Sequence, residues 1–286
     1  MVSTGKLYIC GTPLGNLADI TIRTIETLKK VDLIAAEDTR RSQKLLNEYR
    51  INTPLTGYHE HNEHQKSPKL LAKIKKGKNL ALISDAGMPG ISDPGYELIK
   101  SAIMATIEVI PVPGPTAIIS ALVVSGLSPD RFVFEGFLPR KGKERQARLR
   151  QIQRDERTIV IYESPYRLKD TLKDLTPLLA ERKLAVIREL TKIHEEKIYG
   201  SCVEISRQIK GKEIKGEIVV VIEGLSESVR EKPAWEDLNI KEHVKLLMKN
   251  GYPKKDAIKI VARERDLSRN QVYKKAIAVD ARQYDK

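Results

Sequence analysis

The sequence is poor in cysteine and contains no long apolar run. Its 286 residues include two cysteines, Cys10 and Cys202, which lie far apart. Two isolated cysteines exclude a disulfide framework and are typical of a reducing compartment. No apolar stretch approaches the ~20 residues of a membrane-spanning helix, and residues 1–6 carry no signal-peptide pattern. We therefore expect a cytoplasmic protein with no membrane partner.

Motifs for nucleotide phosphates and for metals are also missing. The loop at residues 11–16 lacks the glycine spacing of a dinucleotide-binding loop and the Gly-Lys-Ser/Thr ending of a phosphate-binding loop. Three histidines, His59, His61 and His64, lie close together but outside the His-Glu-x-x-His register, and no cysteine is near them. We expect no metal site.

Three strand-like runs each lead into a loop rich in glycine and proline. They end at Cys10, Ile83 and Val112, before the loops at residues 11–16, 84–95 and 113–116. The carboxyl ends of parallel strands converge on one crevice, where ligands bind. Asp85 follows its strand closely and could bond a ligand there, although Asp93-Pro94 could equally mark a plain turn that starts a helix. Together the loops predict a ligand held by backbone groups and shape.

The chain predicts two α/β domains and a helical tail. Strands and helices alternate over residues 1–124, and Ser125 to Pro129 is typical of a linker. A second α/β segment follows at 130–226, in which the apolar run 217–222 should form the centre of a sheet. Residues 140–154 predict a basic helix after the first strand of this segment.

The tail at residues 233–286 predicts three short helices. The pattern Ser268-Arg269-Asn270-Gln271 matches a capping box at the start of the third helix. A tight turn before that helix indicates a helix-turn-helix, in which Arg269, Asn270 and Gln271 could contact nucleic acid. The alternative is a small helical lid or a dimer contact.

The positive charge is concentrated in two stretches. The chain carries a formal net charge of +13. Residues 140–157 hold eight Lys/Arg against three Asp/Glu, and residues 233–286 hold thirteen against eight. A surplus that served only solubility would be scattered, so a polyanion, most simply a nucleic acid, is the favoured partner. Candidate contacts are Arg140, Lys141, Lys143, Arg145, Arg148, Lys254, Lys255, Arg269, Asn270 and Gln271.

A series of motifs resembles the bacterial small-subunit rRNA 2′-O-methyltransferases, a branch of the tetrapyrrole methylase superfamily. The motifs lie at residues 11–16, 36–40, 61–63, 84–95, 113–115, 162–167 and 188–192, and the tail matches the C-terminal extension of that branch. Each motif is weak alone, but the order and spacing are specific. One departure is Met88, which stands where the family has threonine.

The resemblance implies a two-domain class III methyltransferase fold with an all-α, helix-turn-helix-like module after it. S-adenosylmethionine (SAM) would bind between the two α/β domains, usually in a homodimer. The implied reaction is methylation of the ribose 2′-hydroxyl of a cytidine in the decoding region of 16S rRNA, with the small ribosomal subunit as partner. These expectations come from the family and not from composition or periodicity.

The family also supplies candidate site residues. The cofactor is expected to contact Gly11, Thr12, Pro13, Leu14, Gly15, Asp85, Gly87, Met88, Pro89 and Thr116. A 2′-hydroxyl is a poor nucleophile, so a base or a cation should lie near it. The candidates are Glu37, Asp38, Glu163 and Glu189 as bases, and Arg40, Arg167 and Lys192 as cations. The sequence does not choose among them.

Two other functions remain open. A methylase of the same superfamily that acts on a tetrapyrrole would also bind a polyanion, but it would not need a separate basic tail. A ribosome-binding factor without catalytic activity would use the tail, but it would not need three convergent glycine-rich and proline-rich loops.

Overall fold

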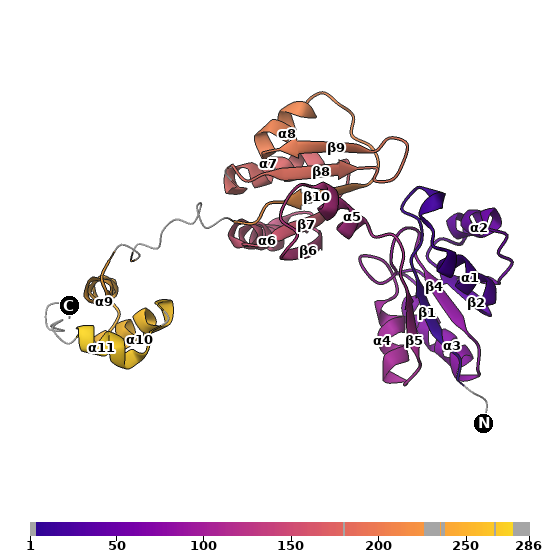
Figure 1. Cartoon of the computed structure of the whole chain (residues 1–286), viewed down its shortest axis with the longest axis horizontal. Helices are drawn as coiled ribbons and strands as arrows, with labels where there is room; N and C mark the ends of the chain where they lie inside the picture. Colours follow the sequence, from indigo (N-terminus) through magenta and orange to yellow (C-terminus); the bar gives the residue numbers. More distant parts are fainter. Residues whose placement is uncertain (1–3, 180, 226–234, 236–237, 266, 277–286) are drawn as a thin grey trace. The chain divides into compact units, whose positions relative to one another are not determined.

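Two five-stranded sheets occupy residues 4–225, and a separate unit of helices begins after residue 225 (Figure 1). The computed structural model describes residues 4–179, 181–225, 235, 238–265 and 267–276.

The first sheet is wholly parallel. Its strand order is β3 (Leu55–Gly57), β2 (Leu33–Ala36), β4 (Leu80–Ile83), β1 (Leu7–Cys10) and β5 (Val109–Val112). Its helices are α1 (Ile22–Lys30), α2 (Thr39–Glu48), α3 (Glu63–Lys75) and α4 (Tyr96–Met104), with a short 3-10 turn η1 (Leu17–Asp19) before α1. Buried side chains of α1 and α2 pack on one face, and those of α3 and α4 pack on the other. Burial on both faces explains why β1, β2 and β4 are almost continuously apolar.

The second sheet mixes parallel and antiparallel pairs. Its order is β6 (Phe132–Phe137), β7 (Thr158–Glu163), β10 (Ile218–Ile222), β8 (Leu184–Arg188) and β9 (Glu196–Gly200). The β6–β7 pair is parallel, and the other three are antiparallel. All five residues of β10 are buried, which confirms that this run forms the centre of a sheet. Helices α6 (Gly142–Arg154), α7 (Leu168–Leu179) and α8 (Cys202–Gln208) supply buried side chains to one face.

Helix α5 (Ala117–Val124) connects the two sheets. It follows β5 of the first sheet, yet Ala121 and Leu122 are buried against side chains of the second sheet, such as Val160 of β7 and Val219 of β10. Figure 1 shows α5 beside β10. The loops that end the first sheet are therefore joined directly to a helix that covers the second.

The second unit contains α9 (Ile240–Lys249), α10 (Lys254–Glu264) and α11 (Arg269–Ala276), which share one apolar core. Gln271 Oε1 accepts from the Ser268 backbone N–H, and Ser268 Oγ accepts from the Gln271 backbone N–H. The capping box predicted before the last helix is thus confirmed.

Trp235 stacks on the buried ring of His243, and burial, together with the charge of Arg265, lowers the pKa of this histidine to about 4.

The predicted fold class is confirmed, with helices following the α/β part. Local details differ from the expectation. Strand β3 was not predicted because it has three residues and no strong apolar pattern. Helix α4 begins at Tyr96 rather than at Asp93. Among the described residues, no helix is long and apolar enough to cross a membrane.

Arg145 is a structural residue of the second sheet's helical layer. It is 6% exposed, and its guanidinium donates to Asp174 Oδ2 at 2.8 Å, Pro139 O at 3.0 Å and Thr171 Oγ1 at 3.0 Å. These three bonds tie α6 to α7 and to the end of β6. Removing the guanidinium would leave buried polar groups without partners.

We expect Arg145→Ala to lower the free energy of unfolding by about 1–3 kcal/mol, because it removes a buried guanidinium and leaves its hydrogen-bond partners unsatisfied. Arg150→Ala is the matched control, since Arg150 is exposed on the same helix and should change stability by less than about 0.5 kcal/mol. Urea unfolding of the full chain measures both. Equal midpoints for the two variants would contradict the structural role of Arg145.

Candidate functional site

The three predicted loops meet at one edge of the first sheet. The Thr12 backbone N–H donates to Gly87 O at 2.9 Å, and the Gly87 N–H donates to Thr12 O at 3.0 Å. Thr12 Oγ1 also donates to Ser84 O at 3.0 Å. The loops after β1 and β4 are therefore fastened to each other beyond the ends of their strands.

The third loop is held by close backbone packing. A Cβ built on Gly11 would lie 2.7 Å from the Gly114 Cα, nearer than real Cβ contacts allow. The Gly11 N–H also donates to Val112 O. Only glycine permits this approach, so the loop after β5 lies directly against the loop after β1.

A cavity of about 660 Å³ lies between these loops and the second sheet. Loop residues and α5 form one part of its wall, and β6, β7 and β10 form another. Its lining includes Leu14, Glu37, Arg41, Asp85, Gly87, Met88, Asp93, Thr116, Phe132, Phe134, Phe137, Tyr162, Glu163 and Glu217. This volume is within the ordinary range for small-molecule sites. A second cavity of about 500 Å³ adjoins it, with Pro13, Gly15, Lys44 and Lys192 in its lining.

The predicted cofactor residues divide into cavity wall and support. Leu14, Asp85, Gly87, Met88 and Thr116 line the main cavity, whereas Pro13 and Gly15 line the smaller one. Gly11, Thr12 and Pro89 line neither. The backbone N–H groups of Gly11, Thr12 and Gly87 already donate within the protein. These three residues therefore shape the loops rather than offer free N–H donors.

Met88 fills space beside the loops. Its Sδ would lie 2.8 Å from a Cβ on Gly11, and its side chain packs against the core between the first sheet and α4. The residue that departs from the family pattern is thus both a cavity wall and a core contact.

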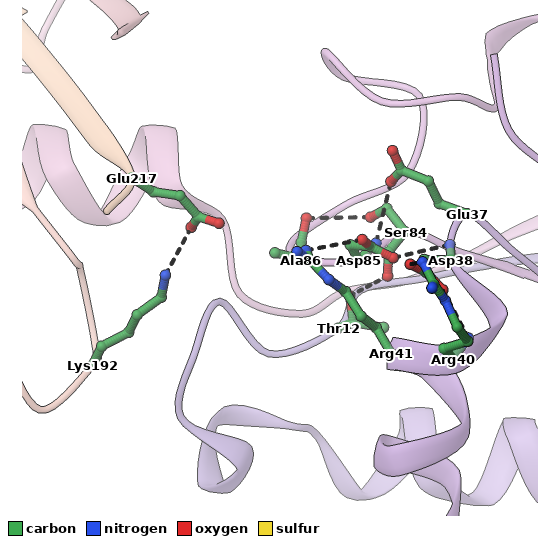
Figure 2. Close-up of polar contacts among 10 residues, drawn as sticks. All are labelled: Thr12, Glu37, Asp38, Arg40, Arg41, Ser84, Asp85, Ala86, Lys192 and Glu217. Carbon is green, nitrogen blue, oxygen red and sulfur yellow. Dashed lines mark hydrogen bonds and ion pairs between the residues drawn. The ribbon is translucent and has the colours of Figure 1, made fainter. Parts of the chain in front are cut away.

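Asp85 fixes the neighbouring loop as well as lining both cavities. Its Oδ1 accepts from the Asp38 backbone N–H at 3.1 Å, and its Oδ2 pairs with Arg41 at 3.1 Å (Figure 2). The Asp85 N–H in turn donates to Glu37 Oε2 at 3.4 Å. The loops after β2 and β4 are held together by this network.

The acidic pair Glu37 and Asp38 separates into two roles. Glu37 lines the cavity, and burial raises the pKa of its carboxyl, with the Asp85 charge adding to the effect. Asp38 caps helix α2, where its Oδ1 accepts from the Arg40 backbone N–H. Hydrogen bonds from the Arg40 side chain and backbone lower the pKa of Asp38 to about 2. Asp38 and Arg40 lie in neither cavity lining and act as a helix cap.

Glu163 is buried at the cavity wall but fully engaged. Its Oε1 accepts from the Ser164 N–H and pairs with Arg167, and its Oε2 accepts from Thr171 Oγ1 at 2.6 Å. A carboxylate with both oxygens occupied in this way holds the turn after β7. It is poorly placed to receive a proton from a substrate.

Lys192 lies between two carboxylates at the smaller cavity. Its Nζ is 2.9 Å from Glu189 Oε1 and 3.2 Å from Glu217 Oε2, the latter contact being visible in Figure 2. Burial opposes its charge, but bonds to these two partners raise the pKa of Lys192 overall. Glu189 lines neither cavity, and Glu217, which was not predicted, lines both.

Asp93 is the functional candidate that sequence reasoning missed. It lines the main cavity, and burial raises the pKa of its carboxyl to about 7, with the charges of Glu37, Asp85 and Glu217 adding to the effect and a hydrogen bond from Ser84 opposing it. The sequence offers Asp93-Pro94 only as the possible start of a helix after a plain turn. Its place in a loop at a strand's carboxyl end was the available signal.

The predicted RNA contacts are unequally available. Arg140, Lys141 and Lys143 are exposed around the start of α6, as are Lys255, Arg269, Asn270 and Gln271 in the second unit, whereas Lys254 is half-buried. Arg145 is buried and bonded as described above, so we remove it from the RNA-binding set. Arg148 pairs with Glu135 at 2.7 Å, and the side chain of Gln271 is used in its capping box.

The histidine cluster lies apart from the cavities. Asn62 Oδ1 accepts from the His59 backbone N–H, and Asn62 Nδ2 lies 2.8 Å from His59 Nε2. Across the described residues, no group of three His, Cys, Asp or Glu side chains is arranged to hold a metal ion.

Comparison with known proteins yields one family and many relatives. A family model described as Tetrapyrrole (Corrin/Porphyrin) Methylases matches residues 6–205. The chain is 47% identical over 278 residues to a ribosomal RNA small subunit methyltransferase I of Synechocystis sp., covering 97% of this chain and 99% of that protein. A Bacillus subtilis protein of the same name is 45% identical, covering 94% of this chain and 93% of that protein.

Solved structures share the fold at low identity. Uroporphyrin-III C-methyltransferase from Thermus thermophilus, complexed with S-adenosylhomocysteine, matches with a TM-score of 0.55 at 17% identity, covering 76% of this chain and 97% of that one. A diphthine synthase matches with a TM-score of 0.61 at 13% identity, covering 77% and 90%. These likenesses confirm the two-domain methyltransferase fold predicted from the resemblance.

The raised pKa of Asp93 predicts a pH-dependent stability. The folded chain keeps the Asp93 proton up to about pH 7, whereas the unfolded chain loses it near the ordinary value of 3.8. Between these values the folded state binds more protons, so the Asp93 contribution falls as pH rises through the window. We expect Asp93→Asn to gain stability relative to wild type from pH 5 to pH 8, measured by urea unfolding.

Asp38→Asn is the control for this series. The pKa of Asp38 is lowered to about 2, so its titration lies below the measured range, and asparagine preserves the helix cap. Its stability difference from wild type should stay constant from pH 5 to pH 8. A constant difference for Asp93→Asn as well would show that Asp93 titrates as an ordinary aspartate.

Proposed function

Since the chain belongs to the tetrapyrrole methylase family, its methyl donor is SAM, and we propose that it methylates the ribose 2′-hydroxyl of a cytidine in the decoding region of 16S rRNA. The names of these relatives support an rRNA substrate, and the relatives match nearly the whole of this chain. The 2′-oxygen and the cytidine are the finer part of the proposal and derive from the motif resemblance.

The charge of the main cavity suits a cationic cofactor. Among the described residues, its lining includes Glu37, Asp85, Asp93, Glu163 and Glu217, against the guanidinium of Arg41. Two of these carboxylates, Glu163 and Glu217, are also paired with Arg167 and Lys192, which lie outside this lining. Opposite charges favour a cation in such a site. When bound, SAM supplies an electrophilic methyl group on a sulfonium. We propose that Leu14, Asp85, Gly87, Met88 and Thr116 hold it, with Gly11 and Thr12 fixing the loops behind them.

The raised pKa of Asp93 is the main observation that supports a reaction in which a proton is removed from the acceptor hydroxyl. A base works best when its pKa lies near the operating pH, and the pKa of Asp93 is raised to about 7 in the cavity. We propose that its ionised carboxylate accepts the proton of the acceptor hydroxyl, while the loops and α5 keep the acceptor aligned for in-line transfer. The rival carboxylates Asp38 and Glu163 are occupied by a helix cap and a turn.

The RNA is proposed to contact two basic surfaces. The first is formed by Arg140, Lys141 and Lys143 around the start of α6, and the second by Lys255 on α10 with Arg269 and Asn270 at the start of α11. The small ribosomal subunit as partner, the homodimer and the cytoplasmic location implied by the resemblance belong to the same proposal. We also propose that residues 1–124 supply most of the SAM-binding loops, that residues 130–226 close the cleft, and that residues 233–286 bind RNA.

The direct test is methyl transfer from radiolabelled SAM. Purified protein is offered small ribosomal subunits and, separately, tetrapyrrole precursors, and any labelled RNA is mapped by nuclease digestion. We expect label on one ribose 2′-oxygen of 16S rRNA. Label on a base of the RNA, or on a tetrapyrrole, would overturn the proposed substrate. Calorimetry with SAM alone separates a missing acceptor from a failure to bind cofactor.

The same assay tests Asp93. We expect Asp93→Asn to lower kcat by roughly 10²–10⁴-fold, the usual contribution of a general base, with a much smaller loss of SAM affinity, because one carboxylate is removed from the cavity. The wild-type kcat/KM for SAM, which reports on the free enzyme, should rise through about pH 7, and the variant should lose that rise. Asp38→Asn serves as control and should keep both kcat and the pH profile. An unchanged profile in Asp93→Asn would assign the base elsewhere.

The second basic surface is tested by a pair of arginines. Arg269 lies at the start of α11 and Arg263 on α10, and both are exposed. We expect Arg269→Gln to raise the KM for small subunits and to reduce the salt slope of binding by about 1, as the loss of one phosphate contact does. SAM affinity should not change. An identical effect of Arg263→Gln would indicate a general charge effect instead of a contact at the helix start.

A further inference from the structure

Strand β6 contains a β-bulge that changes the direction of Phe137. The register with β7 pairs Phe134 with Val160 and Phe137 with Tyr162, and it shifts between Phe134 and Gly136. Side chains three residues apart in a regular strand point to opposite faces. Glu135 is the extra residue here. Because Val160 and Tyr162 are two residues apart and share a face, Phe134 and Phe137 share that face too.

The ring contacts agree with this geometry. The Tyr162 ring centroid lies 4.9 Å from that of Phe134 and 5.6 Å from that of Phe137. All three side chains line the main cavity. The alternate residues of β7, Ile159 and Ile161, point to the opposite face and are buried in the core with α7. Without the bulge, Phe137 would point toward that core.

The bulge is fixed at both of its residues. Gly136 has a φ of 64°, which a larger residue adopts only with strain. The Glu135 carboxylate is 13% exposed and lies 2.7 Å from Arg148 Nη1 of α6. Bulges beside active sites commonly re-aim a side chain in this way. The basic helix α6 therefore holds the bulge that places Phe137.

Phe137 is neither a core residue nor an isolated surface aromatic. It is 55% exposed, although it lines a cavity, so one face of the ring is open to an incoming molecule. Among the described residues, no hydrogen bond from the neighbouring Tyr162 hydroxyl is found. The exposed cations Arg140, Lys141 and Lys143 follow within six residues.

An open aromatic ring beside a row of cations is the usual composition of a platform for single-stranded nucleic acid, in which bases stack while phosphates follow the charges. A ring that served only the cofactor would be covered by the loops that hold it. We propose that Phe137, placed by the Glu135–Gly136 bulge and supported by Tyr162, stacks on a nucleobase of the acceptor RNA at the cavity. This inference rests on the proposed function, because it takes RNA as the acceptor.

The test uses three substitutions of Phe137 in the full chain, with small ribosomal subunits as methyl acceptor. Stacking of one base corresponds to roughly 5- to 150-fold in affinity. We expect Phe137→Ala and Phe137→Leu to raise the KM for subunits by about tenfold or more, and Phe137→Trp to keep it near wild type. Leucine preserves apolar packing without a flat ring, so it separates stacking from burial.

Calorimetry with SAM distinguishes stacking of Phe137 on an RNA base from stacking on the cofactor. We expect the SAM affinity of Phe137→Ala to match wild type. A loss of SAM affinity equal to the loss of subunit affinity would assign the platform to the cofactor and overturn the inference, as would an unchanged KM. Tyr96→Ala is the matched control, since Tyr96 is 61% exposed on α4 and lies outside the cavity lining.

Two arginines of α6 test the bulge. Arg148→Met removes the partner of Glu135, and Arg150→Met removes the same charge from an exposed position. We expect the larger rise in KM from Arg148→Met. Equal effects would overturn the positioning role of the Glu135–Arg148 pair. Absence of RNA methylation by the wild-type protein would be a failure of the proposed function itself, and the Phe137 variants are compared only against an active wild type.

Discussion

The packing of helix α5 on the second sheet is the contact on which the rest of the site depends. Its first residues continue the loop after β5, and its apolar residues, such as Leu122, are buried against β7, β8 and β10. The same helix carries Thr116 as N-cap, and Thr116, Ala117 and Ile118 line the main cavity. The cavity has two walls because one short, strongly apolar helix belongs in sequence to the first sheet and in packing to the second.

The chain as a whole and the wall of the main cavity carry charges of opposite sign. The chain is strongly basic, yet the cavity wall is rich in carboxylates. The two facts agree if the ligands differ in charge, because a sulfonium is attracted by the cavity and phosphates are attracted by the exposed lysines and arginines of α6 and of the helical unit. A scaffold with carboxylates at its surface and cations in its cavity would repel both.

Sequence reasoning succeeded where local pattern decides the structure. The apolar run Ile218–Ile222 identified the central strand, and Ser268 with Gln271 identified a helix start. It failed where distant residues decide. Asp93 lies in the loop after β4, and its pKa is raised by burial and by the charges of Glu37 and Glu217, which are far from it in the sequence. Likewise, no local signal shows that Arg145 points inward among exposed neighbours, or that Glu135 is an extra residue in its strand.

The surroundings of Asp93 link cofactor binding to proton loss. Three carboxylates, those of Glu37, Asp85 and Glu217, act on Asp93 and favour its protonated form. A cation bound in the cavity opposes these charges and favours the ionised form. Thermodynamic linkage requires the converse, so loss of the Asp93 proton strengthens cation binding by the same factor. The carboxylates that disfavour an ionised Asp93 thus also attract the cation that would favour its ionised form, so the proposed base would need no separate activating residue.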